Sequence, residues 1–170
     1  MEADSEESRT IQAVLAAEVG QLDLAYDYLG EAALIDLHDL HHNVKDGLHM
    51  ASLAGAWTAL VAGFGGMRLL NGSLCFAPRL PDSLERLAFH ILFRGSRLRI
   101  EVSAQEATYR LLDGSPLKIR HHGEEILLPV DGVVTRLISD IQIQVGPRPT
   151  QPPGRVPIAR EARVQSTKKV

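Results

Sequence analysis

The sequence lacks the features that would mark an exported, membrane-spanning or nucleic-acid-binding protein. With a single cysteine the chain cannot form an internal disulfide, and this usage fits the reducing cytoplasm. The acidic N-terminus has neither the basic nor the apolar region of a signal peptide. The longest apolar stretch, residues 48–64, is interrupted by glycines and falls short of the roughly 20 residues that span a bilayer. Because the net charge is only -3, we expect a cytoplasmic protein with no membrane and no nucleic acid among its partners.

What the sequence does contain is sufficient for a globular core within four regions. Apolar residues make up 45% of the 170 positions, which is typical of a soluble chain that buries a core. Residues 1–8 are acidic, and residues 141–170 are rich in proline and basic residues, so we expect both to be disordered. Between them we predict a helical region over 9–68 and a β-sandwich domain over 69–140, which is an α+β organisation.

Helical periodicity defines three segments in the first 65 residues. Apolar residues recur at helical spacing over 11–19, where Gly20 is placed to end the helix, and again over 22–37 and 50–61. The third segment is apolar nearly all round, which is typical of a helix buried on every side, with Trp57 inside. Three such helices cannot cover one another, so we expect them to be the last part of a larger helical assembly that begins before Met1. The face of the second helix that the spacing predicts to be buried comprises Leu22, Ala25, Tyr26, Leu29, Ala32 and Ala33.

After residue 66 the apolar period changes from that of a helix to that of a strand. Short alternating runs over 87–93, 97–103 and 106–112 predict half-buried antiparallel strands. We interpret Asp113-Gly114 as a hairpin-type turn, after which further short runs extend to residue 138. Turn residues at such short intervals favour a small antiparallel β-sandwich of the jelly-roll kind.

Four of the seven histidines fall between residues 38 and 49 and raise the question of a metal site. His38, His41 and His42 have no closed tetrahedral spacing and no accompanying CxxC-type signature. A solvated polar loop explains these side chains more simply than a metal ligand set. We therefore predict no metal and no cofactor.

His49 is different because it opens the third predicted helix. The first N–H groups of a helix lack intrahelical partners, and the helix dipole makes that end positive. His49 together with the first-turn residues Met50, Ala51 and Ser52 could therefore hold an anion such as phosphate. The alternative is that His49 caps the helix and Ser52 bonds within it. The pattern alone leaves both interpretations open.

Three motifs relate the chain to a known family. They are Gly47-Leu48-His49-Met50-Ala51-Ser52, Gly63-Phe64-Gly65-Gly66 and Phe76-Ala77-Pro78-Arg79-Leu80-Pro81. Their order resembles the C-terminal portion of glycoside hydrolase family 65, which contains maltose, trehalose and kojibiose phosphorylases and related hydrolases. The resemblance runs from about residue 11 to residue 138.

The resemblance implies the last helices of an (α/α)6 barrel followed by a small C-terminal β-sandwich. It also implies that His49 donates to phosphate while Met50, Ala51 and Ser52 offer backbone or hydroxyl groups. In the family, an upstream glutamate is the general acid, and phosphate or water attacks the anomeric carbon of an α-linked glucosyl disaccharide with inversion. Inorganic phosphate would be the co-substrate of a phosphorylase.

No segment of the chain matches the family's general-acid region. We expect the candidate acids Glu18, Asp23, Asp27 and Glu31 to be solvated or structural, and we therefore expect the chain to be inactive alone. Its partners would then be the missing barrel portion or a second copy, besides disaccharide and phosphate. The alternative is a non-catalytic module that binds carbohydrate or protein, although the eight aromatic residues are few for a sugar platform.

Overall fold

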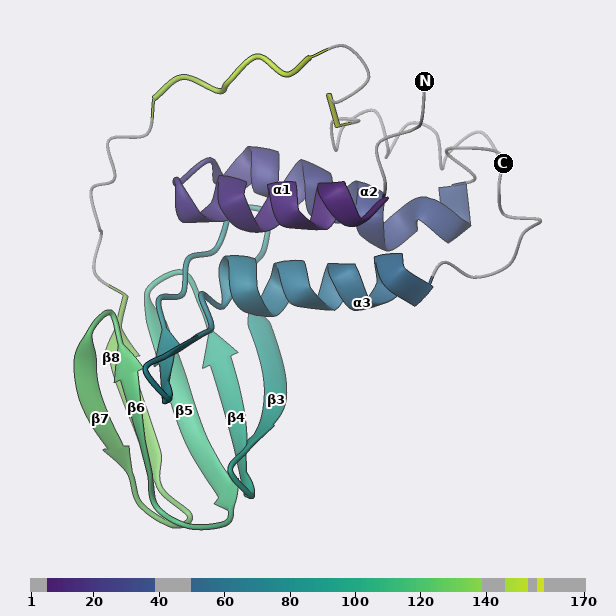
Figure 1. Ribbon diagram of the computed structural model, residues 1–170. Helices are drawn as coiled ribbons and strands as arrows, with labels where there is room; N and C mark the ends of the chain where they lie inside the picture. Colours follow the sequence, from purple (N-terminus) through teal and green to yellow (C-terminus); the bar gives the residue numbers. More distant parts are fainter. Residues whose placement is uncertain (1–5, 39–49, 139–145, 153–155, 158–170) are drawn as a thin grey trace. The chain divides into compact units, whose positions relative to one another are not determined.

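The computed structural model describes residues 6–38, 50–138, 146–152 and 156–157 (Figure 1). They divide into two compact units, a helical unit of Met1–Gly63 with Ile143–Val170 and a strand unit of Phe64–Gln142. None of the helices in the described ranges is both long enough and apolar enough to cross a membrane.

The helical unit contains α1 (Glu6–Glu18), α2 (Leu22–His38) and α3 (Met50–Thr58). The π-helical turn η2 (Ala59–Phe64) continues α3 up to the first residue of the strand unit. In Figure 1, α1 and α2 run side by side and α3 packs against both. The turn after α1 confirms the predicted stop. Gly20 has a positive φ of 81°, and its N–H donates to Ala17 O (3.1 Å) while Gln21 N–H donates to Ala16 O (2.8 Å). These two bonds satisfy the last carbonyls of α1.

Small side chains make the contacts between the helices. Ala13, Ala16 and Ala17 of α1 are buried, and α3 approaches α1 at Gly55, where an added Cβ would overlap Thr10 Oγ1. The large apolar residues of α1 and α3 lie on the opposite, exposed faces. We call these faces the α1 stripe and the α3 stripe. The α1 stripe is Ile11 and Leu15 with Val19, which directly follows the helix, and the α3 stripe is Met50, Leu53 and Trp57.

The expectation that the third helix is buried on every side is therefore wrong for the chain as described. Trp57 is 50% exposed and Met50 is 69% exposed, because α1 and α2 cover only one side of α3. The predicted buried face of α2 is also incomplete. Asp27 and Glu31 are buried, whereas Ala33 is exposed.

The strand unit is a sandwich of two four-stranded sheets. One sheet has the order β1-β2-β6-β7 and the other β3-β4-β5-β8, and all neighbours are antiparallel except the parallel pair β2 and β6. Alternate side chains from both sheets face inward, including Phe76, Ile100 and Tyr109. The strands are β1 (Arg68–Leu70), β2 (Ser73–Phe76), β3 (Leu87–Phe93), β4 (Ser96–Val102), β5 (Glu106–Asp113), β6 (Leu117–His121), β7 (Glu124–Leu128) and β8 (Val133–Leu137).

One predicted turn has a different role in the structure. Asp113-Gly114 is not a hairpin turn, because β5 and β6 belong to different sheets. The turn carries the chain from one layer to the other, and Gly114 has a φ of 104° with Ser96 close to the position of a Cβ. The two-residue hairpins instead have Asn71-Gly72, Arg94-Gly95 and His122-Gly123 at their tips, all with positive φ.

Candidate phosphate site

The candidate anion site lies at the start of α3. The helix begins at Met50, so Met50, Ala51 and Ser52 occupy its first turn, where backbone N–H groups have no intrahelical acceptor. The Met50 side chain is exposed. His49 and the preceding loop, including His41 and His42, lie outside the described residues. The proposed histidine–phosphate contact therefore stays a prediction.

The position of this helix start is fixed by how α3 packs. Gly55 lies against Thr10. A Cβ added at Gly63 would lie 3.5 Å from Val14 Cα and 3.6 Å from Ala17 Cβ. A side chain at Gly55 would overlap Thr10, whereas a Cβ at Gly63 would make ordinary van der Waals contacts with α1. Thr58 Oγ1 donates to Ala54 O (2.9 Å), which satisfies that hydroxyl within the helix.

The carboxylates of the helical unit are used in packing. Arg148 Nη2 donates to Asp27 Oδ2 at 2.9 Å, and Arg9 forms an ion pair with Glu31. Only 7% of the Asp27 side chain and 3% of the Glu31 side chain are exposed. Buried carboxylates that are ion-paired in this way serve structure, and a partner lost from such a pair is costly. Within the described ranges, no cluster of three or more histidine, cysteine, aspartate or glutamate side chains is arranged to hold a metal.

The strand unit contains a polar cluster that the sequence pattern did not reveal. Tyr109 Oη lies 2.7 Å from His121 Nδ1, and His121 Nε2 lies 3.0 Å from the Leu137 carbonyl oxygen. The carbonyl can only accept, so Nε2 carries the proton and Nδ1 accepts from the Tyr109 hydroxyl. Burial lowers the pKa of His121, which favours this neutral form, and burial raises the pKa of Tyr109. The cluster joins three strands, and both of its side chains are buried.

Two of the family motifs have a structural role in the strand unit. Ala77 N–H donates to Gly66 O (3.2 Å) and Arg79 N–H donates to Phe64 O (2.8 Å), so the two motif segments lie side by side. Gly66 has a φ of 60°, and an added Cβ there would overlap the backbone of Ala77. Both hydrogen bonds join the backbone before β1 to the backbone after β2.

Two family models match the chain in this order of elements. The model of the glycosyl hydrolase family 65 central catalytic domain matches residues 1–58, and that of the family 65 C-terminal domain matches residues 67–128. The chain therefore belongs to glycoside hydrolase family 65. Its fold is the last helices of an (α/α)6 barrel followed by a small, mostly antiparallel β-sandwich.

Individual relatives agree with this assignment. An uncharacterized glycosyl hydrolase of Mycobacterium leprae is 52% identical over 162 residues, covering 94% of this chain and 20% of the relative. An α,α-trehalose phosphorylase of Thermoanaerobacter brockii is 42% identical over 125 residues, covering 74% of this chain and 16% of the relative. A solved structure with the provisional name of a kojibiose phosphorylase from the human microbiome has a TM-score of 0.72 and 26% identity, covering 78% of this chain and 19% of the other. The chain thus spans about a fifth of the length of these proteins.

Proposed function

We propose that this chain is the C-terminal part of an inverting family 65 enzyme that acts on α-linked glucosyl disaccharides, with phosphate or water as the nucleophile. The observation that carries the proposal is the match of two consecutive family domains, supported by 42% identity to a trehalose phosphorylase. Among disaccharides, this identity makes trehalose the first substrate to test. Inorganic phosphate is the co-substrate if the enzyme is a phosphorylase.

In this proposal the start of α3 binds phosphate. Free N–H groups in the first turn and the positive end of the helix dipole attract an anion. His49 adds a side-chain donor immediately before the turn, and Ser52 adds a hydroxyl. In a hydrolase the same position would bind product or water instead of phosphate. Measured affinity for phosphate therefore distinguishes a phosphorylase from a hydrolase.

The 170-residue chain does not turn over substrate in this proposal. An inverting glycosidase needs a protonated carboxyl group for the leaving oxygen, and a hydrolase needs a second carboxylate for water. Asp27 and Glu31 cannot supply either role because both are buried in ion pairs with arginines. Activity then requires another part of the barrel, which supplies the general acid and the sugar pocket.

The surface for that partner is the pair of apolar stripes. The three residues of the α1 stripe are 54–59% exposed, and those of the α3 stripe are 44–69% exposed. Helices of a multi-helix barrel bury such stripes against neighbouring helices. A second copy of the chain is the competing occupant, and sedimentation of the purified chain distinguishes the two.

The activity test uses the purified chain with trehalose, maltose or kojibiose and inorganic phosphate. We expect no β-glucose 1-phosphate above the level of a buffer blank. Formation of that product by the chain alone would refute the inactivity, while leaving the family assignment unchanged.

The site test measures inorganic phosphate by chemical-shift titration of the Met50, Ala51 and Ser52 amides. We expect saturable shifts in the wild-type chain and at least about tenfold weaker binding in His49→Ala, because one charge-assisted donor contributes roughly 1.5–3 kcal/mol. His90→Ala is the matched control, since His90 is an exposed histidine on β3. Equal weakening by both variants would indicate a non-specific charge effect and would contradict the assigned role of His49.

A further inference from the structure

The segment 146–152 packs against the helical unit although its composition predicts a disordered tail. Its sequence begins Gly146-Pro147-Arg148-Pro149. Each proline fixes its own φ and also restricts the residue before it to extended conformations. Both Gly146 and Arg148 precede a proline, so the segment is already extended before it meets any surface. Little conformational entropy is then lost when it binds.

One face of α2 and the residue that precedes it contact this segment through polar groups. Gln21 Nε2 donates to the carbonyl oxygens of Gly146 (2.7 Å) and Pro147 (3.4 Å). Arg148 Nη2 donates to Asp27 Oδ2 (2.9 Å). Asp27 is nearly fully buried, whereas the Arg148 side chain is 45% exposed. The half-exposed Arg148 side chain therefore forms an ion pair with a carboxylate that is buried in the helical unit.

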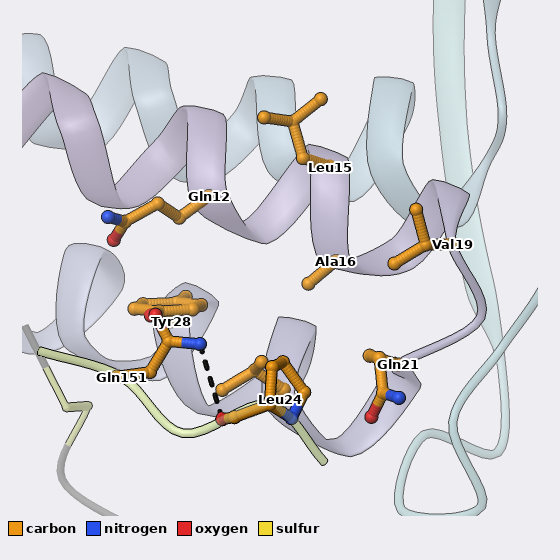
Figure 2. Close-up of a pocket in the computed structure, with 9 residues that line it drawn as sticks. Gln12, Leu15, Ala16, Val19, Gln21, Leu24, Tyr28 and Gln151 are labelled. Atoms are coloured by element: carbon orange, nitrogen blue, oxygen red, sulfur yellow. Dashed lines mark hydrogen bonds between the residues drawn. The ribbon is translucent and has the colours of Figure 1, made fainter. Parts of the chain in front are cut away.

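Beyond the ion pair, the segment and α2 border a common cavity. Leu24 and Tyr28 lie on the same face of α2, and with Pro149 and Gln151 they border a cavity of about 210 Å³ (Figure 2). Gln151 Nε2 lies 3.4 Å from Pro149 O, a bond within the segment that Figure 2 marks with a dashed line. Leu15 and Val19 of the α1 stripe also line the cavity. The segment thus adds a third wall to the groove between α1 and α2.

We propose that Gln21, Leu24, Asp27 and Tyr28 form a recognition site for an extended proline–arginine–proline segment, and that residues 146–152 of the same chain are its ligand. We call this segment the C-terminal clasp. In this site Gln21 donates hydrogen bonds to main-chain carbonyls of the segment, and Asp27 forms the ion pair with Arg148. Leu24 and Tyr28 border the cavity that Pro149 also lines. This site is separate from the start of α3 and does not depend on sugar or phosphate binding.

The first test measures backbone order in the full chain by ¹⁵N NMR relaxation. In the wild type we expect order parameters of about 0.8 for the Arg148, Thr150 and Gln151 amides, as in rigid backbone. Arg148→Ala should lower them below about 0.6, because the variant removes the ion pair with Asp27 that holds the segment on α2. Arg110→Ala, at an exposed arginine on β5, should leave them unchanged. Low values in the wild type, or no decrease in Arg148→Ala, would overturn the proposal.

A second test supplies the ligand as a separate molecule. A synthetic peptide of residues 146–152 is added at millimolar concentration to the full-chain Arg148→Ala variant. We expect the Leu24 and Tyr28 amide signals to shift in this variant and not in the wild type, where the covalently attached clasp already fills the site. A peptide in which alanine replaces the arginine should cause no shift. Equal shifts in wild type and variant would refute occupancy by the chain's own segment.

Discussion

Gly55 allows α3 to approach α1, and its replacement tests the packing of the helical unit most directly. A Cβ at this position would overlap Thr10 Oγ1 and would lie 3.2 Å from Thr10 Cβ and 3.3 Å from Thr10 Cγ2. Thr10 is buried, and its β-branched side chain has few alternative rotamers. Relief of the overlap therefore requires either a different Thr10 rotamer in a buried site or a separation of the two helices.

Two opposing effects set the size of the change in Gly55→Ala. Alanine is favoured over glycine in a helix interior by about 1 kcal/mol. Overpacking a close helix contact costs about 1–3 kcal/mol. We expect the overlap to prevail, so that Gly55→Ala lowers the free energy of unfolding of the helical unit by about 1 kcal/mol.

The sign should reverse when Thr10 is shortened. Thr10 Oγ1 is buried and has no hydrogen-bond partner among the described residues, so Thr10→Ala removes an unsatisfied hydroxyl at little cost. In that background the remaining 3.2 Å contact needs only a small shift. Gly55→Ala should then raise stability by roughly 0.5 kcal/mol, which corresponds to a coupling of roughly 1.5 kcal/mol between the two positions.

The assay is urea unfolding of the four chains of this double-mutant cycle, followed by tryptophan fluorescence. Trp57 is the only tryptophan and lies on α3, so its emission reports the helical unit and not the strand unit. If the free energy of unfolding falls with urea concentration at the same slope in all four chains, the mutations change stability and not the surface exposed on unfolding. If Gly55→Ala changes stability equally in the wild type and in Thr10→Ala, the prediction that Gly55 and Thr10 are in close contact is wrong.

Two further predictions concern the strand unit. Gly66→Ala should destabilise the strand unit by on the order of 2–4 kcal/mol, because a Cβ there would overlap the Ala77 backbone. A Cβ at Gly95 meets open space, so Gly95→Ala should cost only about 1 kcal/mol, which comes from its positive φ. Equal losses of stability in thermal unfolding would contradict this prediction. Tyr109→Phe should cost about 1–3 kcal/mol at pH 8, since His121 Nδ1 loses its donor. The pKa of His121 in the folded chain lies below the value of 6.5 that applies in the unfolded chain. The stabilising contribution of neutral His121 is therefore complete above pH 6.5 and declines as the pH falls, because the unfolded chain binds the proton first. Unfolding midpoints independent of pH between 8 and 5 would refute this role.

Local signals in the sequence predicted most of the elements. The end of α1 just before Gly20 follows from glycine as a helix stop, and the bounds of β3 at 87–93 follow from the alternation of apolar residues. The short strands β1 and β2 were not predicted, and neither was the parallel pairing of β2 with β6. Pairing between segments far apart in sequence depends on the whole sandwich and leaves no local period. For the same reason the Asp113-Gly114 turn could not be recognised as a crossing between sheets.

The charged residues of α2 show a second limit of the sequence. Helical spacing placed Ala33 on the buried face and gave no reason to bury Asp27 or Glu31. In the structure Asp27 is buried because Arg148, 121 positions later, supplies the positive charge. A carboxylate with such a distant partner cannot be distinguished by pattern from a solvated one. The motif that includes His49 was recognisable by resemblance, but only the helix start at Met50 lies within the described residues.

The arrangement of small and large residues in the helical unit connects its stability to its proposed function. Fully burying one large apolar side chain contributes about 1.5–3 kcal/mol, and α1 and α3 leave six of them roughly half exposed. Covering both stripes would therefore add on the order of 5 kcal/mol, a large fraction of the stability of an ordinary domain. Since the α3 stripe includes Met50, a partner that covers it would also fix the first turn of α3. Binding of the rest of the barrel and ordering of the phosphate site should consequently be a single coupled event, in which phosphate strengthens the association by the same factor as the association strengthens phosphate binding.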